Sequence, residues 1–204
     1  MAGSFQQIKE FVLIETELVA LLKQKDRLAF KAMVETWQGM VYNTALGILQ
    51  NEEDAEDVTQ EVFIKVFEAV SSFKGESKFS TWLYRITVSK AMDHIRKKKR
   101  KKRFAFIQGL YGKNDEPLID PPDFFHPGIS AENKENAAVL FKAMEQLPPN
   151  QKSAFVLNKV EGLSYHEIAE VMKISESAVD ALLHRAKTNL KKILAGYYKE
   201  LNQS

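Results

Sequence analysis

The sequence of 204 residues contains no cysteine. Disulfide bonds and thiolate metal ligands are therefore excluded, and the chain is compatible with a reducing compartment. No apolar run approaches the ~20 residues that a membrane-spanning helix needs, and the N-terminus lacks the basic start of a secretory signal. We therefore expect a protein of the cytoplasm.

Histidine is scarce, and no histidine belongs to a recognisable catalytic pattern. The four histidines are scattered over the chain: His94, His126, His166 and His184. None lies in a Ser-His-Asp, HExxH or P-loop arrangement. We therefore expect no enzymatic activity, including activity on nucleic acid, and no cofactor or metal ion.

The hydrophobic content of 45% is enough for packed cores, and apolar residues recur with a helical period over most of the chain. Periodicity is lost between residues 104 and 132, which are rich in helix breakers: Pro117, Pro121, Pro122, Pro127 and Gly128. The sequence predicts an all-α protein in which two small helical domains, residues 1–103 and 133–204, are joined by the flexible linker 104–132.

The stretch from Gly162 to Leu190 is typical of a helix-turn-helix. Ser164 and Glu167 have the spacing of a capping box, which starts a helix after Gly162. A turn at 173–174 and an N-cap at Ser175 then begin a second helix. Its expected core stripe consists of Val179, Leu183, Ala186 and Leu190.

The other face of this second helix is polar and partly basic: Ser177, Ala181, His184, Arg185 and Thr188. Helical hairpins are common, so an ordinary hairpin is the alternative to a DNA-binding unit. The helix, the tight turn and the mixed basic face occur together, and this combination favours DNA binding in the major groove.

An acidic helix is expected from Asn51 to Phe67, with a buried stripe and a charged exposed face. The exposed face carries Glu53, Asp57, Gln60, Glu61 and Lys65. Such a face is most simply a solvated surface. A divalent metal is disfavoured because successive acidic residues on a helix splay apart and no histidine completes a ligand set.

A loop at Ser71–Phe79 leads into a helix at Ser80–Arg96, and a fully cationic run, RKKKRKKR, follows from Arg96 to Arg103. An aromatic, basic loop beside such a helix suits single-stranded nucleic acid, although Trp82 and Tyr84 taken alone favour core packing. The run could be a solvated tail, but its position beside the loop favours contact with phosphates.

Together these segments resemble a bacterial sigma factor of the extracytoplasmic-function (ECF) group, the subunit with which RNA polymerase finds promoters. DAEDVTQEVFIKVF is similar to the polymerase-binding helix of that family, FKGESKFSTWLYRITVSKAMDHIRK to its promoter-melting and −10-reading segment, and LPPNQKSAFVLNKVEGLSYHEIAEVM with the next helix to its −35-reading domain. The resemblance implies direction of polymerase to −10 and −35 elements.

The resemblance also implies three sets of site residues. Polymerase contacts are expected at Asp57, Gln60 and Glu61. Contacts to the −10 element are expected at Phe73, Lys74, Ser77, Lys78, Phe79, Trp82, Arg85, Ser89, Asp93 and Arg96. Contacts to the −35 element are expected at Ser175, Ser177, Asp180, Ala181, His184, Arg185, Lys187 and Thr188.

The partners that the resemblance implies are promoter DNA and core RNA polymerase, through the clamp helices of its largest subunit and the flap of its second-largest subunit. An anti-sigma factor, often membrane-anchored in this family, is also expected, and the free chain should be a monomer. Ser89 replaces a frequent Asn, and Asp180, Ala181 and Leu182 replace a more basic set, so the promoter sequence does not transfer from relatives. The rival hypothesis, a stand-alone helix-turn-helix regulator, leaves the acidic helix and the loop unexplained.

Overall fold

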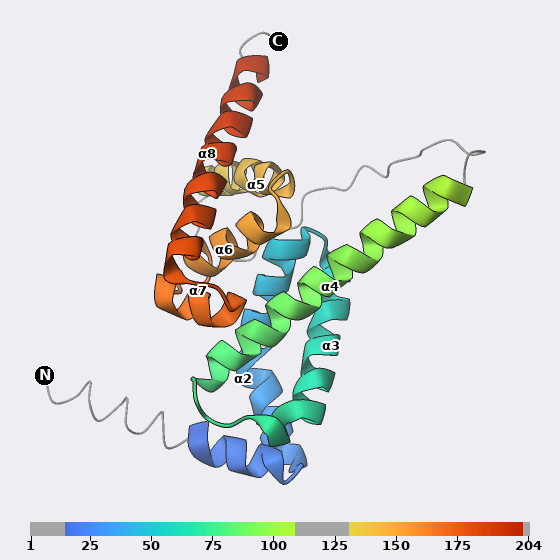
Figure 1. Ribbon diagram of the computed structural model, residues 1–204, viewed down its shortest axis with the longest axis vertical. Helices are drawn as coiled ribbons and strands as arrows, with labels where there is room; N and C mark the ends of the chain where they lie inside the picture. Colours follow the sequence, from blue (N-terminus) through green and yellow to red (C-terminus); the bar gives the residue numbers. More distant parts are fainter. Residues whose placement is uncertain (1–14, 109–130, 202–204) are drawn as a thin grey trace, which may run out of the picture.

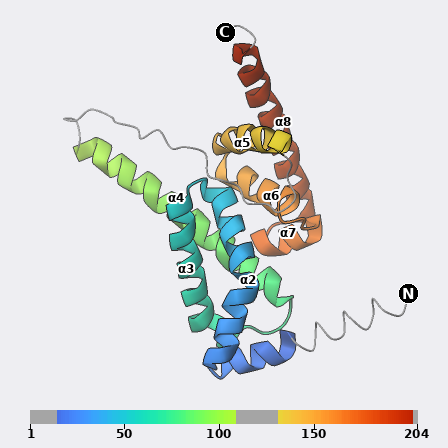
Figure 2. The ribbon, with the colours of Figure 1, turned by 180° about the vertical axis from the view of Figure 1, so that it is seen from behind.

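The computed structural model describes residues 15–108 and 131–201, and within these ranges every regular element is helical. The first unit consists of a helix at 15–23, α2 (Arg27–Leu49), α3 (Glu52–Ala69), the short 3₁₀ helix η1 (Val70–Ser72) and α4 (Phe79–Gln108). Figures 1 and 2 show α2, α3 and α4 packed side by side. None of the helices in the described ranges is long and apolar enough to cross a membrane.

Side-chain caps define where the helices of the first unit begin. The Asp26 carboxylate accepts a hydrogen bond from the Ala29 N–H at the start of α2, and the Asn51 amide oxygen accepts one from the Asp54 N–H at the start of α3. These bonds satisfy backbone donors that the first turn of a helix leaves free. The expected buried stripe of α3 is confirmed, since Ala55, Val58, Val62 and Val66 are all buried.

The second unit contains α5 (Ala131–Glu145), α6 (Pro149–Lys159), α7 (Tyr165–Met172) and α8 (Glu176–Leu201). Gly162, with φ +72°, occupies the left-handed region between α6 and α7, where glycine is favoured. Both expected helix starts are present: Ser164 and Glu167 form a capping box, and the Ser175 hydroxyl accepts a hydrogen bond from the Ala178 N–H. The predicted helix-turn-helix is therefore α7 and the start of α8.

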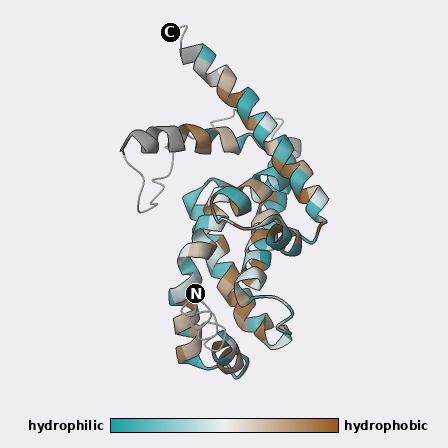
Figure 3. Cartoon of the chain, turned by 90° about the vertical axis from the view of Figure 1, so that its left-hand side faces the viewer, coloured by the Kyte–Doolittle hydropathy of each residue, from teal (hydrophilic) through white to brown (hydrophobic). Residues whose placement is uncertain are grey.

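The core of α8 follows the predicted pattern, since Val179, Leu183, Ala186 and Leu190 are all buried. Figure 3 shows the same principle over the whole chain, because hydrophilic and hydrophobic residues alternate along the helices. Each helix buries one side and exposes the other.

The two units pack against each other through α4 with α7 and α2 with α6. One close contact between the units is at Gly47, where an added Cβ atom would lie 2.9 Å from the Cγ1 atom of Val156. We call this packed arrangement the closed form. The short span of a relaxed linker predicts that the two units of the free chain lie close together, with Phe104, Phe106, Phe124 or Phe125 as candidate contacts. None of these four side chains is among those that the structure describes.

The helix α4 extends beyond its expected end. We predicted a helix to Arg96, a cationic run to Arg103 and a linker from residue 104, whereas α4 is continuous through Gln108. The reason is local, because no Pro or Gly occurs between Phe79 and Gly109, and Lys, Arg and Ala are good helix formers.

Candidate polymerase and promoter interfaces

The acidic face of α3 forms one side of a cleft of about 590 Å³ whose other side is α4. Asp57 and Gln60 are exposed, and Glu61 is half-buried. The Lys90 ammonium lies 3.0 Å from a Glu61 carboxylate oxygen, and this hydrogen bond lowers the pKa of Glu61. Glu61 is therefore held ionised and in a fixed direction beside two exposed neighbours.

A second ion cluster closes the cleft at the start of α3. The Asp54 carboxylate lies 3.0 Å from His94 Nε2 and 2.5 Å from Lys98 Nζ. Asp54 therefore contacts α4, and these contacts explain why Asp54 is less exposed than Asp57, which lies one turn away on α3.

Sequence reasoning missed two apolar residues on α3. Ile64 is 60% exposed and Phe67 is 42% exposed, and Ile64 lines the same cleft as Asp57 and Gln60. The signal was present, because Ile64 stands four residues after Gln60 and so falls on the exposed side of the helix. An exposed apolar side chain beside carboxylates is typical of a surface that receives a protein partner.

The loop between η1 and α4 is built on buried aromatic rings. Phe79 is fully buried and Phe73 is 8% exposed. The two rings contact each other at 5.5 Å between centroids, and both contact Trp82 at 5.2–5.5 Å. In the described structure these rings shape the loop, whereas Lys74 and Lys78 are exposed and Ser77 is partly exposed.

A cleft of about 600 Å³ lies between this loop and the helix at 15–23. Lys23 lines one wall, and Lys74 and Lys78 line the other. The Glu15 carboxylate accepts a hydrogen bond from the Phe79 N–H and so caps the start of α4 from another helix. The helix at 15–23 thus fixes one end of the loop.

Several of the expected −10 residues on α4 face the second unit. Arg85, Ser89, Asp93 and Arg96 line a cleft of about 440 Å³ whose far wall includes Ser153 and Met172. The Arg85 guanidinium donates to the backbone oxygen of Glu170 at 2.9 Å, while its buried Nε atom has no hydrogen-bond partner among residues 15–108 and 131–201. Arg96 pairs with Asp93 on the surface.

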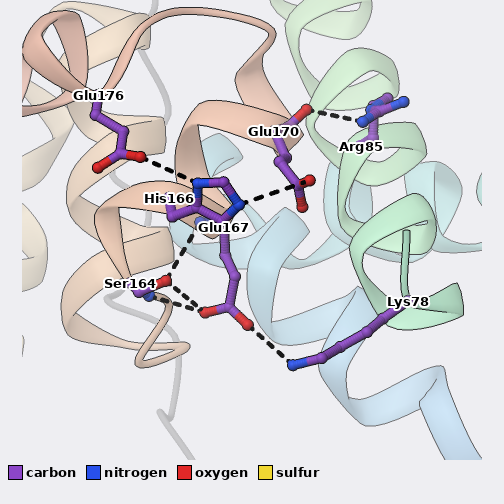
Figure 4. Close-up of polar contacts among 7 residues, drawn as sticks. All are labelled: Lys78, Arg85, Ser164, His166, Glu167, Glu170 and Glu176. Atoms are coloured by element: carbon purple, nitrogen blue, oxygen red, sulfur yellow. Dashed lines mark hydrogen bonds and ion pairs between the residues drawn. The ribbon is translucent and has the colours of Figure 1, made fainter. Parts of the chain in front are cut away.

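Two further contacts join α4 and its preceding loop to the second unit. Figure 4 shows Lys78 reaching Glu167, 3.3 Å away, and Arg85 reaching Glu170. The Tyr84 hydroxyl donates to the Glu161 carboxylate at 2.8 Å, and burial together with Glu161 raises the pKa of Tyr84. In the closed form, the Glu167 side chain of α7 therefore pairs with Lys78, and the Glu170 backbone oxygen of α7 accepts from Arg85.

The start of the helix-turn-helix is a polar network of its own (Figure 4). Glu167 accepts hydrogen bonds from the backbone N–H and the hydroxyl of Ser164, and these bonds lower the pKa of Glu167. His166 Nδ1 lies 3.0 Å from the Glu176 carboxylate, which raises the pKa of His166. This pair joins α7 to the first turn of α8 across the turn.

The expected −35 residues form an open surface on α8 and its N-cap. Ser175, Ser177, Asp180, His184, Arg185, Lys187 and Thr188 are exposed, and Ala181 is partly exposed. The Ser175 and Ser177 hydroxyls lie 2.9 Å apart, so they are oriented by the helix cap. The closed form brings the −10 set against α7 but leaves this surface of α8 uncovered.

The fold is that of an all-helical protein whose second unit carries a helix-turn-helix, the architecture of a DNA-binding domain. Residues 33–101 match the family model of sigma-70 region 2, and residues 138–190 match that of sigma-70 region 4. The chain belongs to the ECF-type sigma factors of RNA polymerase, which direct the polymerase to promoters and are not enzymes.

The chain is similar to curated relatives over most of its length. It is 33% identical to the ECF RNA polymerase sigma-E factor of Haemophilus influenzae, covering 86% of this chain and 92% of the relative. It is 30% identical to the sigma-E factor of Escherichia coli K12, with coverage of 86% and 91%. The RNA polymerase sigma-H factor of Pseudomonas aeruginosa is 29% identical, with coverage of 91% and 96%.

Two solved structures share the fold. CnrH in complex with the cytosolic domain of CnrY has a TM-score of 0.63 at 21% identity, covering 89% of this chain and 97% of that one. The sigma factor RpoE of Bartonella quintana, in complex with the anti-sigma factor NepR, also has a TM-score of 0.63, at 22% identity and with coverage of 81% and 96%.

Proposed function

We propose that the three surfaces divide the work of promoter recognition. Asp57, Gln60 and Glu61 on α3 bind the clamp helices of the polymerase. The loop and α4 read and melt the −10 element. The exposed face of α8 reads the −35 element, with Arg185 as the residue best suited to a base contact.

The observation that supports this proposal most strongly is that the chain carries an acidic surface and a basic surface on different elements. The α3 surface is acidic with exposed Ile64, which suits a protein partner, whereas the loop and the end of α4 expose many cations. A stand-alone DNA-binding regulator needs only the second kind of surface.

Three parts of the −10 assignment have different physical roles. Phe73, Phe79 and Trp82 support the loop through buried ring contacts. The lysines on the two sides of the neighbouring cleft attract backbone phosphate, and the cleft has room for an unstacked base. Arg85, Ser89, Asp93 and Arg96 are then the α4 side chains that meet the strand once α7 moves away.

The proposed partners extend to an anti-sigma factor. The similarity to RpoE, which was solved with the anti-sigma factor NepR, supports a regulator of this kind for this chain. Such a partner would keep the chain from polymerase, and an anchored one would do so at a membrane.

The experiment that tests the proposed function is reconstituted transcription. Purified chain is added to core RNA polymerase with a library of genomic fragments, and the RNA start sites are sequenced. We expect specific initiation that depends on the chain, with two shared sequence elements upstream of each start. If the chain binds fragments equally well without polymerase and never alters start-site choice, the stand-alone regulator is correct instead.

A further inference from the structure

The C-terminal part of α4 is a rigid basic arm. Figures 1 and 2 both show α4 projecting past α3, and residues 96–103 are all exposed. From Arg96 to Gln108 the helix advances about 18 Å, at ~1.5 Å per residue. Because the run is helical, the position of each cation around the axis is fixed.

The arginines of the arm share one side of the helix. Successive residues are about 100° apart around the axis, so Arg96, Arg100 and Arg103 fall within a sector of about 60°. Arg85 and Ser89 fall in the same sector farther back along α4. We call Arg96, Arg100 and Arg103 the arginine stripe, and it continues the line of the expected −10 residues.

The other side of the arm belongs to lysine, and part of it faces α3. Lys98 pairs with Asp54, while Lys97 and Lys101 line the cleft between α3 and α4. Lys101 and Lys102 lie about 130° from the centre of the arginine sector. The sequence RKKKRKKR therefore places Lys98, Lys101 and Lys102 away from the arginines, whereas Lys99 flanks the arginine sector at about 70° from its centre.

We propose that the arginine stripe binds the phosphates of duplex DNA immediately upstream of the −10 element. This inference rests on the proposed function, which places that element at the loop and the first turns of α4. The linker that leads to the −35-reading unit leaves from the end of α4, so the arm points upstream. There the DNA is still paired.

The chemistry of the stripe suits this ligand. The planar guanidinium of Arg donates two parallel hydrogen bonds to a phosphate, which the ammonium of Lys does not do. Arg96 to Arg103 spans about 10 Å, or about three base pairs at 3.4 Å each. The surface ion pair of Arg96 with Asp93 is exposed and exchanges readily for a phosphate contact.

Two double variants with the same net charge test the stripe. Arg100→Gln with Arg103→Gln removes stripe cations, and Lys101→Gln with Lys102→Gln removes two neighbours at the same depth along the arm. Each variant is assembled with core polymerase. Affinity for a promoter fragment selected by the wild-type holoenzyme is then measured over a range of salt concentrations.

We expect the slope of log affinity against log salt to flatten by about 2 units for the arginine pair, at ~0.9 per phosphate contact. The lysine pair should change the slope by less than half as much. Equal effects of both pairs, or no effect of either, would show that the run acts as a diffuse charge or a spectator. Weaker competition of the arginine pair for core polymerase, with an unchanged slope, would assign the stripe to a protein surface instead.

The same experiment distinguishes an incorrect assignment of the arginine stripe from an incorrect proposed function. If the wild-type chain selects no fragment with core polymerase, the proposed function itself is refuted. If it selects a promoter and the two double variants have equal slopes, only the stripe is refuted.

Discussion

The exposed fraction of a side chain separates residues that pack the core of this protein from residues that are free to contact a partner. The aromatic residues near the loop illustrate the distinction, since Phe79 is fully buried and Phe67 is 42% exposed. The resemblance to ECF sigma factors implied that the phenylalanines of the loop contact DNA. Because the rings are buried and hold the loop, we predict that the exposed Lys74 and Lys78, rather than the rings, contact DNA directly.

At the residue scale, we predict that Gln60→Ala with Glu61→Ala weakens binding to core polymerase. Gln60 is exposed, and Glu61 is tied only to the surface residue Lys90, so the fold should survive the change. Competition with the wild-type chain for core enzyme measures the loss, which we expect to be tenfold or more. Glu35→Ala is the matched control, because Glu35 is an exposed glutamate on a different helix, α2. Undiminished competition by the double variant would mean that this face is merely solvated.

The exposed guanidinium of Arg185 gives a second prediction at this scale. Arg185→Ala should cost about 1–3 kcal/mol of binding free energy if the side chain reaches a base edge, with relaxed preference at one promoter position. Binding of holoenzyme to promoter variants altered at each −35 position measures both effects. A uniform loss over all variants would assign Arg185 to a phosphate, and no loss at all would contradict the proposed orientation of α8.

At the scale of elements, helix starts were predictable and one helix end was not. The capping residues Asn51, Ser164 and Ser175 predict where their helices begin. Each accepts a hydrogen bond from a backbone N–H three residues later, so the spacing is visible in the sequence. The end of α4 was placed too early because the cationic run was interpreted by its charge. Its lack of helix breakers up to Gly109 was the better guide.

The capping box provides the prediction for this scale. Ser164→Ala removes the acceptor of the Glu167 N–H, 3.2 Å away, and should lower the free energy of unfolding by about 1 kcal/mol. Urea unfolding of the full chain at pH 7 measures it. Ser177→Ala, which removes a hydroxyl bonded to the neighbouring Ser175 hydroxyl, serves as the control and should cost less.

The same variant has a defined pH dependence. The pKa of Glu167 is lowered in the folded chain, first by its hydrogen bonds to Ser164. Its contribution is therefore present above the pKa of an unfolded glutamate and is lost as the pH falls through the folded value. The stability difference between wild type and Ser164→Ala should shrink in acid. A difference that grows as the pH falls would contradict this account.

At the scale of the whole molecule, periodicity shows which face of a helix is buried but does not show which partner covers it. The packing of α4 on α7 and of α2 on α6 was therefore beyond the sequence, although a compact free chain was expected from the linker. The proposed −10 and −35 elements lie roughly 70 Å apart on DNA, or about two helical turns. Since Lys78 and Arg85 contact α7 in the closed form, we predict that the two units separate before both elements are bound.

Gly47 offers a way to test that separation. In Gly47→Ala the new Cβ atom would lie 2.9 Å from Val156 Cγ1, and such overpacking typically costs 1–3 kcal/mol. We expect the contact between α2 and α6 to loosen and the units to move apart. Because the chain has no cysteine, Lys31→Cys and Lys192→Cys provide two exposed positions, one on each unit, for a pair of fluorophores. Energy transfer between the fluorophores should be lower when Gly47→Ala is present than when Gly47 is kept.

Two companion variants separate this steric effect from the helix propensity of alanine. Gly39→Ala adds a methyl group to the same helix with no atom within 4 Å of it, so energy transfer should stay at the wild-type level. Val156→Ala combined with Gly47→Ala removes the clashing methyl groups and should restore the wild-type signal. Equal energy transfer in Gly47→Ala and Gly39→Ala would mean that the α2–α6 contact does not hold the closed form, and would leave the packing of α4 and its preceding loop on the second unit to hold it.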